Sequence, residues 1–189
     1  MSSSSSSPSL LELCQAAVRL LRDADINFLA IDFDHTFIDD HTAGKFKGTA
    51  SELGLKVRTV FRHIVPLAFQ HGLFIAIVTF SGQVDLIKQM LMQEFPEQGH
   101  RIVIRGNDRS WARPVDARGK TAHISDAVEE IKVSHQVQIT IRSTILIDDD
   151  NDNIEIALTN RTKAILYIPE DPNSEKKLVN DIITLMSPR

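Results

Sequence analysis

Five short apolar runs recur along the chain, and segments with helical spacing separate them. The runs are "INFLAIDF", "LFIAIVTF", "HRIVIRG", "STILIDDD" and "KAILYIP". Runs this continuous suit strands that are buried on both faces, and such strands occur mainly in parallel sheets that helices cover. The sequence therefore predicts an α/β protein with a doubly wound parallel sheet flanked by helices.

The segments between the runs are predicted as helices. The first covers about residues 10–22, and a long one, "SELGLKVRTVFRHIVPLAFQHG", follows the first strand and a polar loop at residues 38–48. Pro66 should bend or restart this long helix because proline lacks a backbone donor, and Gly72 is placed to end it. The remaining helices are predicted over "VDLIKQMLMQEF", "TAHISDAVEEIKV", residues 153–158 and "SEKKLVNDIITLM".

Length and composition fit one globular domain. The chain has 189 residues, 42% of them hydrophobic, which suffices for one core over residues 9–189. The serine-rich start, residues 1–8, has little to bury and is predicted to be a disordered tail. The single cysteine, Cys14, cannot form an intramolecular disulfide and is predicted to pack in the core.

Neither a targeting signal nor a membrane span is visible in the sequence. The start lacks the basic and apolar segments of a secretory signal, and no run approaches the roughly 20 apolar residues that span a bilayer. We therefore expect a soluble cytoplasmic protein with no membrane partner. The net charge of −4 provides no basic field for general nucleic-acid binding, so nucleic acid is expected only as a special substrate.

Polar side chains gather where three of the predicted strands end. The first strand ends with Asp32 and Asp34, the second with Thr79 and Ser81, and the fourth with residues 148–150, which are all aspartate. The carboxyl ends of parallel strands meet at one edge of the sheet, where ligands bind. Four or more carboxylates that converge there require a cation, and hard oxygen ligands favour Mg²⁺. The sequence therefore predicts a magnesium site at this edge.

Two carboxylates separated by one residue can divide a two-step reaction between them. Asp32, at the end of the strand, is placed to attack an electrophile, and Asp34 is placed to handle the proton. One nucleophile and one acid/base are what transfer through a covalent aspartyl intermediate requires. This pattern indicates a group-transfer enzyme.

These segments resemble, in chain order, the motifs of the haloacid dehalogenase-like (HAD) superfamily phosphatases. "AIDFDHT" is similar to the first motif, "IAIVTFSG" to the second and "ILIDDDNDNI" to the fourth. The third motif is a lysine ahead of the last of these strands, and we assign it to Lys120 in "RGKTAHI". The resemblance covers about residues 28–168, which is most of the chain, and implies a Rossmann-like sheet.

The resemblance also implies catalytic roles. Asp32 would attack phosphorus, and Asp34 would protonate the leaving oxygen and later activate water. Lys120 would offset negative charge on the nucleophile and on the phosphoryl group. The phosphoryl oxygens would be bound at the end of the second strand and by the lysine, that is, by Thr79, Phe80, Ser81 and Lys120.

A ligand set for the metal follows from the same resemblance. Mg²⁺ would be held by Asp32, by the backbone carbonyl of Asp34, and by Asp148 or Asp149 together with water. Of the last two aspartates, we favour Asp148 as the direct ligand.

Several assignments stay open at this level. Lys132 competes with Lys120 for the third motif, although a lysine near the end of a helix is usually solvated. His35 lies inside the first motif without an evident task. The loop at residues 38–48 reads as a solvated loop, with substrate contact as the alternative.

The sequence leaves no room for a full cap domain in either gap where HAD phosphatases insert one. The layout is similar to the magnesium-dependent phosphatase-1 group, and "KTAH" and "DDDNDN" echo that group's patterns. An uncapped site would admit a small phosphorylated molecule, an exposed phosphoprotein or a nucleic-acid end, or it could be closed by a second copy in a homo-oligomer. Trp111, Arg113 and Arg118 are candidates for a substrate rim.

The sequence thus predicts a Mg²⁺-dependent phosphomonoester hydrolase. Dehalogenase activity is disfavoured because Asp34 supplies the proton-transfer residue, and ATPase activity because the family's ATPases carry lysine at the position of Phe33. A receiver-like phosphoacceptor is one alternative, but receivers have their acidic pair first and their lysine last. A non-catalytic HAD protein that binds phospho-ligands is another, and the complete set of acids argues against it.

Overall fold

The core of the molecule is a five-stranded sheet whose strands all run parallel, in the order β3-β2-β1-β4-β5. The computed structural model describes residues 7–111, 114 and 118–187. The strands are β1 (Phe28–Ile31), β2 (Phe74–Val78), β3 (Val103–Arg105), β4 (Thr144–Asp148) and β5 (Lys163–Leu166). Each forms within one of the five apolar runs, so the predicted parallel sheet is confirmed.

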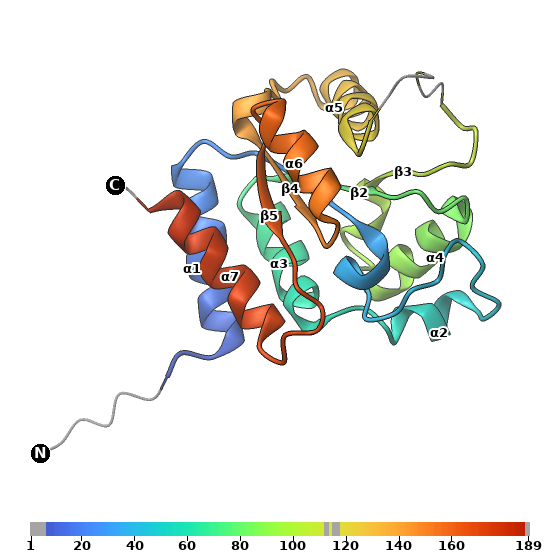
Figure 1. The fold of residues 1–189 in the computed structure, drawn as a ribbon, viewed down its shortest axis with the longest axis horizontal. Helices are drawn as coiled ribbons and strands as arrows, with labels where there is room; N and C mark the ends of the chain where they lie inside the picture. The colour runs from blue at the N-terminus through green and yellow to red at the C-terminus, as the bar shows by residue number, and fades with distance from the viewer. Residues whose placement is uncertain (1–6, 112–113, 115–117, 188–189) are drawn as a thin grey trace, which may run out of the picture.

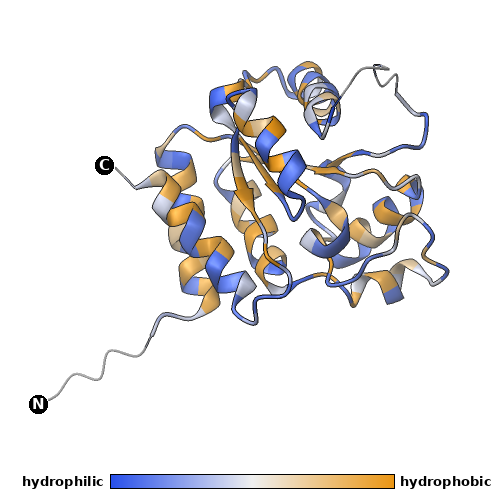
Figure 2. Ribbon diagram, viewed as in Figure 1, coloured by the Kyte–Doolittle hydropathy of each residue, from blue (hydrophilic) through white to orange (hydrophobic). Residues whose placement is uncertain are grey.

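Helices cover both faces of this sheet (Figure 1). They are α1 (Leu10–Asp23), α2 (Ala50–Gly54), α3 (Thr59–Gln70), α4 (Val84–Glu94), α5 (Thr121–His135), α6 (Asn151–Thr159) and α7 (Ser174–Met186). Side chains alternate along β1, so Leu29 and Ile31 pack with α1, α3, α4 and α7, whereas Phe28 and Ala30 pack with α5 and α6. Figure 2 shows the result: the strands are mostly hydrophobic, and the helices carry hydrophilic residues on their outer sides.

The prediction of one long helix before β2 is wrong about where that helix is interrupted. The chain forms two helices there, and the break lies at residues 55–58 rather than at Pro66, which is inside α3. The break has a tertiary cause: Val57 pairs with Ile38 in an antiparallel bridge, and Asp39 N–H donates to the Lys56 carbonyl at 2.9 Å. An extended segment that pairs with another segment cannot continue a helix.

The start of α6 differs from the prediction, and the serine-rich tail lies largely outside the described residues. α6 begins at Asn151, before the predicted start, because the Asp150 side chain accepts the backbone N–H groups of Asp152 and Asn153. The serine tract lies largely in residues 1–6, outside the described residues.

Across the described ranges, no helix combines the length and the apolar character needed to cross a membrane.

The strand order places the site. The chain passes from β1 outward through β2 to β3, and then crosses to the other side of β1 to form β4 and β5. Connections on opposite sides of β1 leave a crevice beyond the carboxyl ends of β1 and β4. The turn η1 (Phe33–Phe37) follows β1 directly at this crevice.

Candidate functional site

A pocket of about 280 Å³ opens at the carboxyl edge of β1, β2 and β4. Its walls come from the ends of these strands, from the start of α5 and α6, and from the loop after η1. They comprise Asp32, Asp34, His35, His41, Ala43, Gly44, Thr79, Phe80, Ser81, Lys120, Asp148, Asp149, Asp150 and Asn153. Every residue that the sequence predicted for catalysis, phosphate binding or metal binding therefore lines one pocket.

Three carboxylates converge inside it. Asp32, Asp148 and Asp149 each offer one oxygen, and these oxygens all lie within 4.8 Å of one another. Asp32 Oδ1 accepts a hydrogen bond of 2.6 Å from the Nζ of Lys120, whose side chain is 2% exposed. When all four groups are ionised, three negative charges face one positive charge. The cluster then has two negative charges more than its lysine can neutralise.

Burial makes this excess costly. Burial, together with the neighbouring charges of Asp148 and Asp149, raises the pKa of Asp32 to about 7, against the opposing attraction of Lys120. Burial also raises the pKa of Asp148. A cation between the carboxylates would relieve both the desolvation and the repulsion. A divalent ion with hard oxygen ligands fits this donor set.

Neighbouring donors fix how two of these carboxylates face the pocket. The side-chain amide of Asn153 donates to both oxygens of Asp148 at 3.1 Å, and Asp150 N–H donates to Asp148 Oδ1 at 2.9 Å. Thr36 Oγ1 donates to Asp149 Oδ1 at 2.9 Å and so connects η1 to the end of β4. Carboxylates held in this way need little reorganisation to bind an ion.

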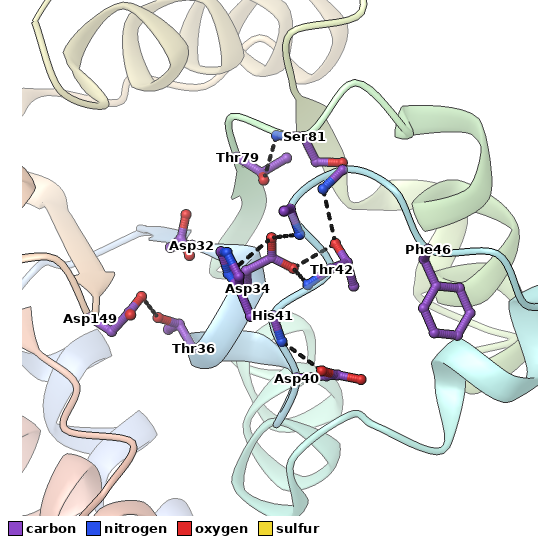
Figure 3. A network of polar contacts seen from close by, with 12 residues as sticks. Asp32, Asp34, Thr36, Asp40, His41, Thr42, Phe46, Thr79, Ser81 and Asp149 are labelled. Carbon is purple, nitrogen blue, oxygen red and sulfur yellow. Dashed lines mark hydrogen bonds and ion pairs between the residues drawn. The ribbon is translucent and has the colours of Figure 1, made fainter.

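Asp34 lies in the same pocket, but its carboxylate takes no part in the three-carboxylate cluster. Figure 3 shows it directed at the loop after η1, where it accepts hydrogen bonds from Thr42 N–H at 3.0 Å, Thr42 Oγ1 at 2.8 Å and Ala43 N–H at 3.1 Å. The predicted contribution of Asp34 to a metal site is its backbone carbonyl, and the side chain is thus available for another task. Nothing in the sequence pattern pointed to Thr42.

The end of β2 forms a tight polar turn. Ser81 N–H donates to Thr79 Oγ1 at 3.0 Å, and both residues are buried. The Thr79 hydroxyl keeps its own hydrogen for a further acceptor. The ring of Phe80 is 43% exposed, and Lys120 Nζ lies 3.9 Å from its centroid. The predicted phosphate-binding residues therefore lie together beside Asp32.

The structure separates the two candidate lysines. Lys120 lies at the start of α5, next to Asp32. Lys132 lies in the last turn of the same helix and pairs with Glu129 at 3.3 Å. The 12 positions between them correspond to about 18 Å along the helix axis. Lys132 is thus far from the cluster.

His35, which the sequence left unexplained, occupies a special backbone position. Its φ is 58°, in the left-handed region where histidine is among the better tolerated residues. Its N–H donates to the Asp40 carbonyl, and its own carbonyl accepts from Arg58. The ring stacks on His41 with centroids 4.8 Å apart. His35 therefore shapes the turn that carries Asp34.

Of the residues predicted for a substrate rim, Trp111 and Arg118 lie outside the walls of this pocket, although the ring of Trp111 packs on His123, which in turn contacts Phe80. Trp111 and Arg118 line a larger hollow of about 980 Å³ between α5 and α6, and Arg113 lies outside the described residues. Two carboxylates of that hollow, Asp126 and Glu129, already form ion pairs with arginine or lysine. The smaller pocket, with its converging acids, has the composition of a reactive site.

Comparisons with known proteins bear on the fold. No family model and no curated protein matches the sequence. Among solved structures, the HAD domain of the effector protein Lem4 from Legionella pneumophila matches with a TM-score of 0.51, 16% identity and coverage of 84% of this chain and 94% of that one. This chain has the fold of a HAD domain.

A second solved structure has a similar extent. It is an uncharacterized protein from Corynebacterium glutamicum, with a TM-score of 0.48, 13% identity and coverage of 85% of this chain and 95% of that one. The identity to the Lem4 domain is low, so that likeness concerns the fold alone. In this HAD fold, residues 38–58 contain only the five-residue helix α2, which is too short to form a cap domain.

Proposed function

We propose that the protein is a Mg²⁺-dependent phosphomonoester hydrolase that acts through an aspartyl phosphate on Asp32. The observation that carries the proposal is the cluster of the buried Asp32 and Asp148 with the half-buried Asp149, together with the hydrogen bond from Lys120 to Asp32. A nucleophilic carboxylate beside a fixed cation, at the carboxyl end of the central strand, is suited to attack a phosphoryl group.

The residues around Asp32 divide the remaining tasks. Lys120 neutralises part of the charge that accumulates on the nucleophile and the phosphoryl oxygens. Thr79 and the turn at Ser81 offer a hydroxyl and backbone groups to those oxygens. Asp34 gives a proton to the leaving oxygen and then accepts one from the water that hydrolyses the aspartyl phosphate.

Mg²⁺ would be held by Asp32, the backbone carbonyl of Asp34, and Asp148 or Asp149, and would supply charge neutralisation for the phosphoryl group. The donor set fits this ion because it consists of oxygens only and has two excess negative charges.

The proposal predicts metal-dependent turnover. Purified protein should hydrolyse a generic aryl phosphate in the presence of Mg²⁺ and show no hydrolysis in excess chelator, with activity restored when Mg²⁺ is added back. The measurement is the initial rate of phenolate release. If the protein hydrolysed none of a broad panel of phosphate monoesters in the presence of Mg²⁺, the proposed enzyme function would be refuted.

A second prediction concerns stability and does not depend on turnover. Because the pKa of Asp32 is raised to about 7 in the folded protein and is near 4 in an unfolded chain, the metal-free protein should lose stability as the pH rises from about 4 to 7. Mg²⁺ should offset this loss. At a concentration 100 times its Kd, it stabilises by about 2.7 kcal/mol, which corresponds to roughly 5–10 °C in Tm for a chain of this size.

Thermal melts with and without Mg²⁺ at pH 5.5 and pH 8 test this expectation. The increase in Tm should be larger at pH 8, where protons no longer compete for Asp32. The Asp149→Asn variant keeps an acceptor for Thr36 and should reduce the increase. The matched variant Glu155→Gln, which removes a charge outside the pocket, should not. An equal Tm with and without Mg²⁺ at pH 8 would argue against the metal site.

A further inference from the structure

The loop after η1 crosses the mouth of the pocket and is fastened at both ends. We call residues 41–46 the strap. At its start, Thr42 and Ala43 donate three hydrogen bonds to the Asp34 carboxylate. At its end, Phe46 N–H donates to Gln83 Oε1 at 2.7 Å, and Gln83 Nε2 donates to the Phe46 carbonyl at 2.9 Å.

The middle of the strap approaches the end of β2. A side-chain carbon at Gly44 would lie 3.4 Å from Cα of Ser81, so the strap passes close to the turn proposed to bind phosphate. The strap therefore spans from Asp34 to Ser81 across the pocket, as Figure 3 shows. A wall that is fastened at both ends and packs close to Ser81 can hold the Asp34 side chain in one orientation.

The two oxygens of Asp34 accept different numbers of hydrogen bonds from the strap. A carboxylate has about four lone-pair sites, two on each oxygen. Oδ1 accepts from both Thr42 N–H and Thr42 Oγ1, so its sites are occupied. Oδ2 accepts a hydrogen bond from Ala43 N–H, and His41 Nδ1 lies 3.8 Å from it, beyond hydrogen-bond distance. One lone-pair site of Oδ2 is therefore left for a proton.

We propose that Thr42 is a positioning residue that reserves Oδ2 of Asp34 for proton transfer to the leaving group. The proposal rests on the phosphatase function proposed above. The Thr42 hydroxyl donates to Asp34 Oδ1 and accepts from Gly44 N–H at 3.3 Å, so one side chain orders both the carboxylate and the strap.

The step that depends on this arrangement is the first one. An oxygen of Asp32 forms a bond to phosphorus while the bond from phosphorus to the leaving oxygen breaks, and the electron pair of that bond stays on the leaving oxygen. The proton on Asp34 Oδ2 passes to this oxygen, and an alcohol departs. In the second step, the oxygen of a water molecule forms a bond to phosphorus, the bond from phosphorus to the Asp32 oxygen breaks, and inorganic phosphate departs. Oδ2 takes a proton from this water, which restores protonated Asp34.

Leaving groups differ in how much they need this proton. A nitrophenolate is stable as an anion and departs with little assistance, whereas an alkoxide must be protonated as it leaves. A misdirected acid therefore slows alkyl phosphates more than activated aryl phosphates. The ratio of the two kcat/KM values reports this step, because kcat/KM includes events only up to the first irreversible step.

The test compares Thr42→Val with Thr42→Ser on an alkyl phosphate and on p-nitrophenyl phosphate, with Mg²⁺. We expect Thr42→Val to lower kcat/KM for the alkyl phosphate about tenfold and for the aryl phosphate less than twofold. Thr42→Ser keeps the hydroxyl and should restore most of the lost activity. The matched control is Thr49→Val, which removes the cap of α2 outside the pocket and should leave the ratio unchanged.

An equal loss for both substrates, or no rescue by serine, would overturn the positioning role. A wild-type protein without activity on either substrate would instead refute the phosphatase function, so the two failures are distinguishable. Melting temperatures of the three variants, measured in parallel, show whether loss of folding contributes. A Thr42→Val protein that is folded and unchanged in its ratio also counts against the proposal.

Discussion

Replacing Asp32 with asparagine should abolish phosphomonoester hydrolysis while the protein stays folded. The amide oxygen of asparagine is a poor nucleophile, so the aspartyl phosphate cannot form. It can still accept the hydrogen bond from Lys120, and the substitution removes one of three repelling charges. We expect the rate to fall at least about 10⁴-fold, as when a covalent nucleophile is removed from an enzyme.

Two measurements separate this chemical effect from misfolding. Initial rates on an aryl phosphate with Mg²⁺ should be lost in Asp32→Asn and kept in Asp85→Asn, a matched change at an exposed position on α4. Thermal melts of metal-free Asp32→Asn at pH 8 should show no loss of stability, because the substitution removes the negative charge of Asp32, which burial and the neighbouring aspartates disfavour. Full activity in Asp32→Asn would refute Asp32 as the nucleophile.

The sheet was predictable because its information is local. Each strand is a continuous apolar run, and runs buried on both faces leave few alternatives to a parallel sheet with helices on each side. The break between α2 and α3 was not predictable for the opposite reason. It depends on the pairing of Val57 with Ile38, and the sequence of neither segment indicates that it pairs with the other.

In the candidate site, too, the contacts set by strand order were predictable and those set by the loop conformation were not. Asp32 and Asp148 end strands that neighbour each other in the sheet, so the sequence could bring them together. The contact of Asp34 with Thr42 depends on a chain reversal with positive φ at three positions, His35, Ala43 and Gly44. Only one of them is glycine, the residue that usually marks such a turn. The loop therefore read as solvated.

Lys120 provides the second large effect, because it is both the cation beside the nucleophile and a buried charge. Lys120→Ala should lower kcat by about 10²- to 10⁴-fold, since nothing else among the described pocket residues offers a fixed positive side chain beside Asp32. It should also destabilise the metal-free protein by about 3 kcal/mol, because removing one partner of a buried pair leaves the other charge uncompensated. Lys120→Met, which keeps most of the volume, should lose activity equally.

Lys132→Ala is the matched control, on the same helix and with the same change. Lys132 forms one exposed ion pair with Glu129, which is worth less than about 1 kcal/mol, so its loss should leave kcat and Tm nearly unchanged. Side-by-side rates and melts, with and without Mg²⁺, decide between the two lysines. A comparable loss from both variants, or a loss only from Lys132→Ala, would reject Lys120. A loss only from Lys120→Ala and Lys120→Met would place the required positive charge beside the nucleophile.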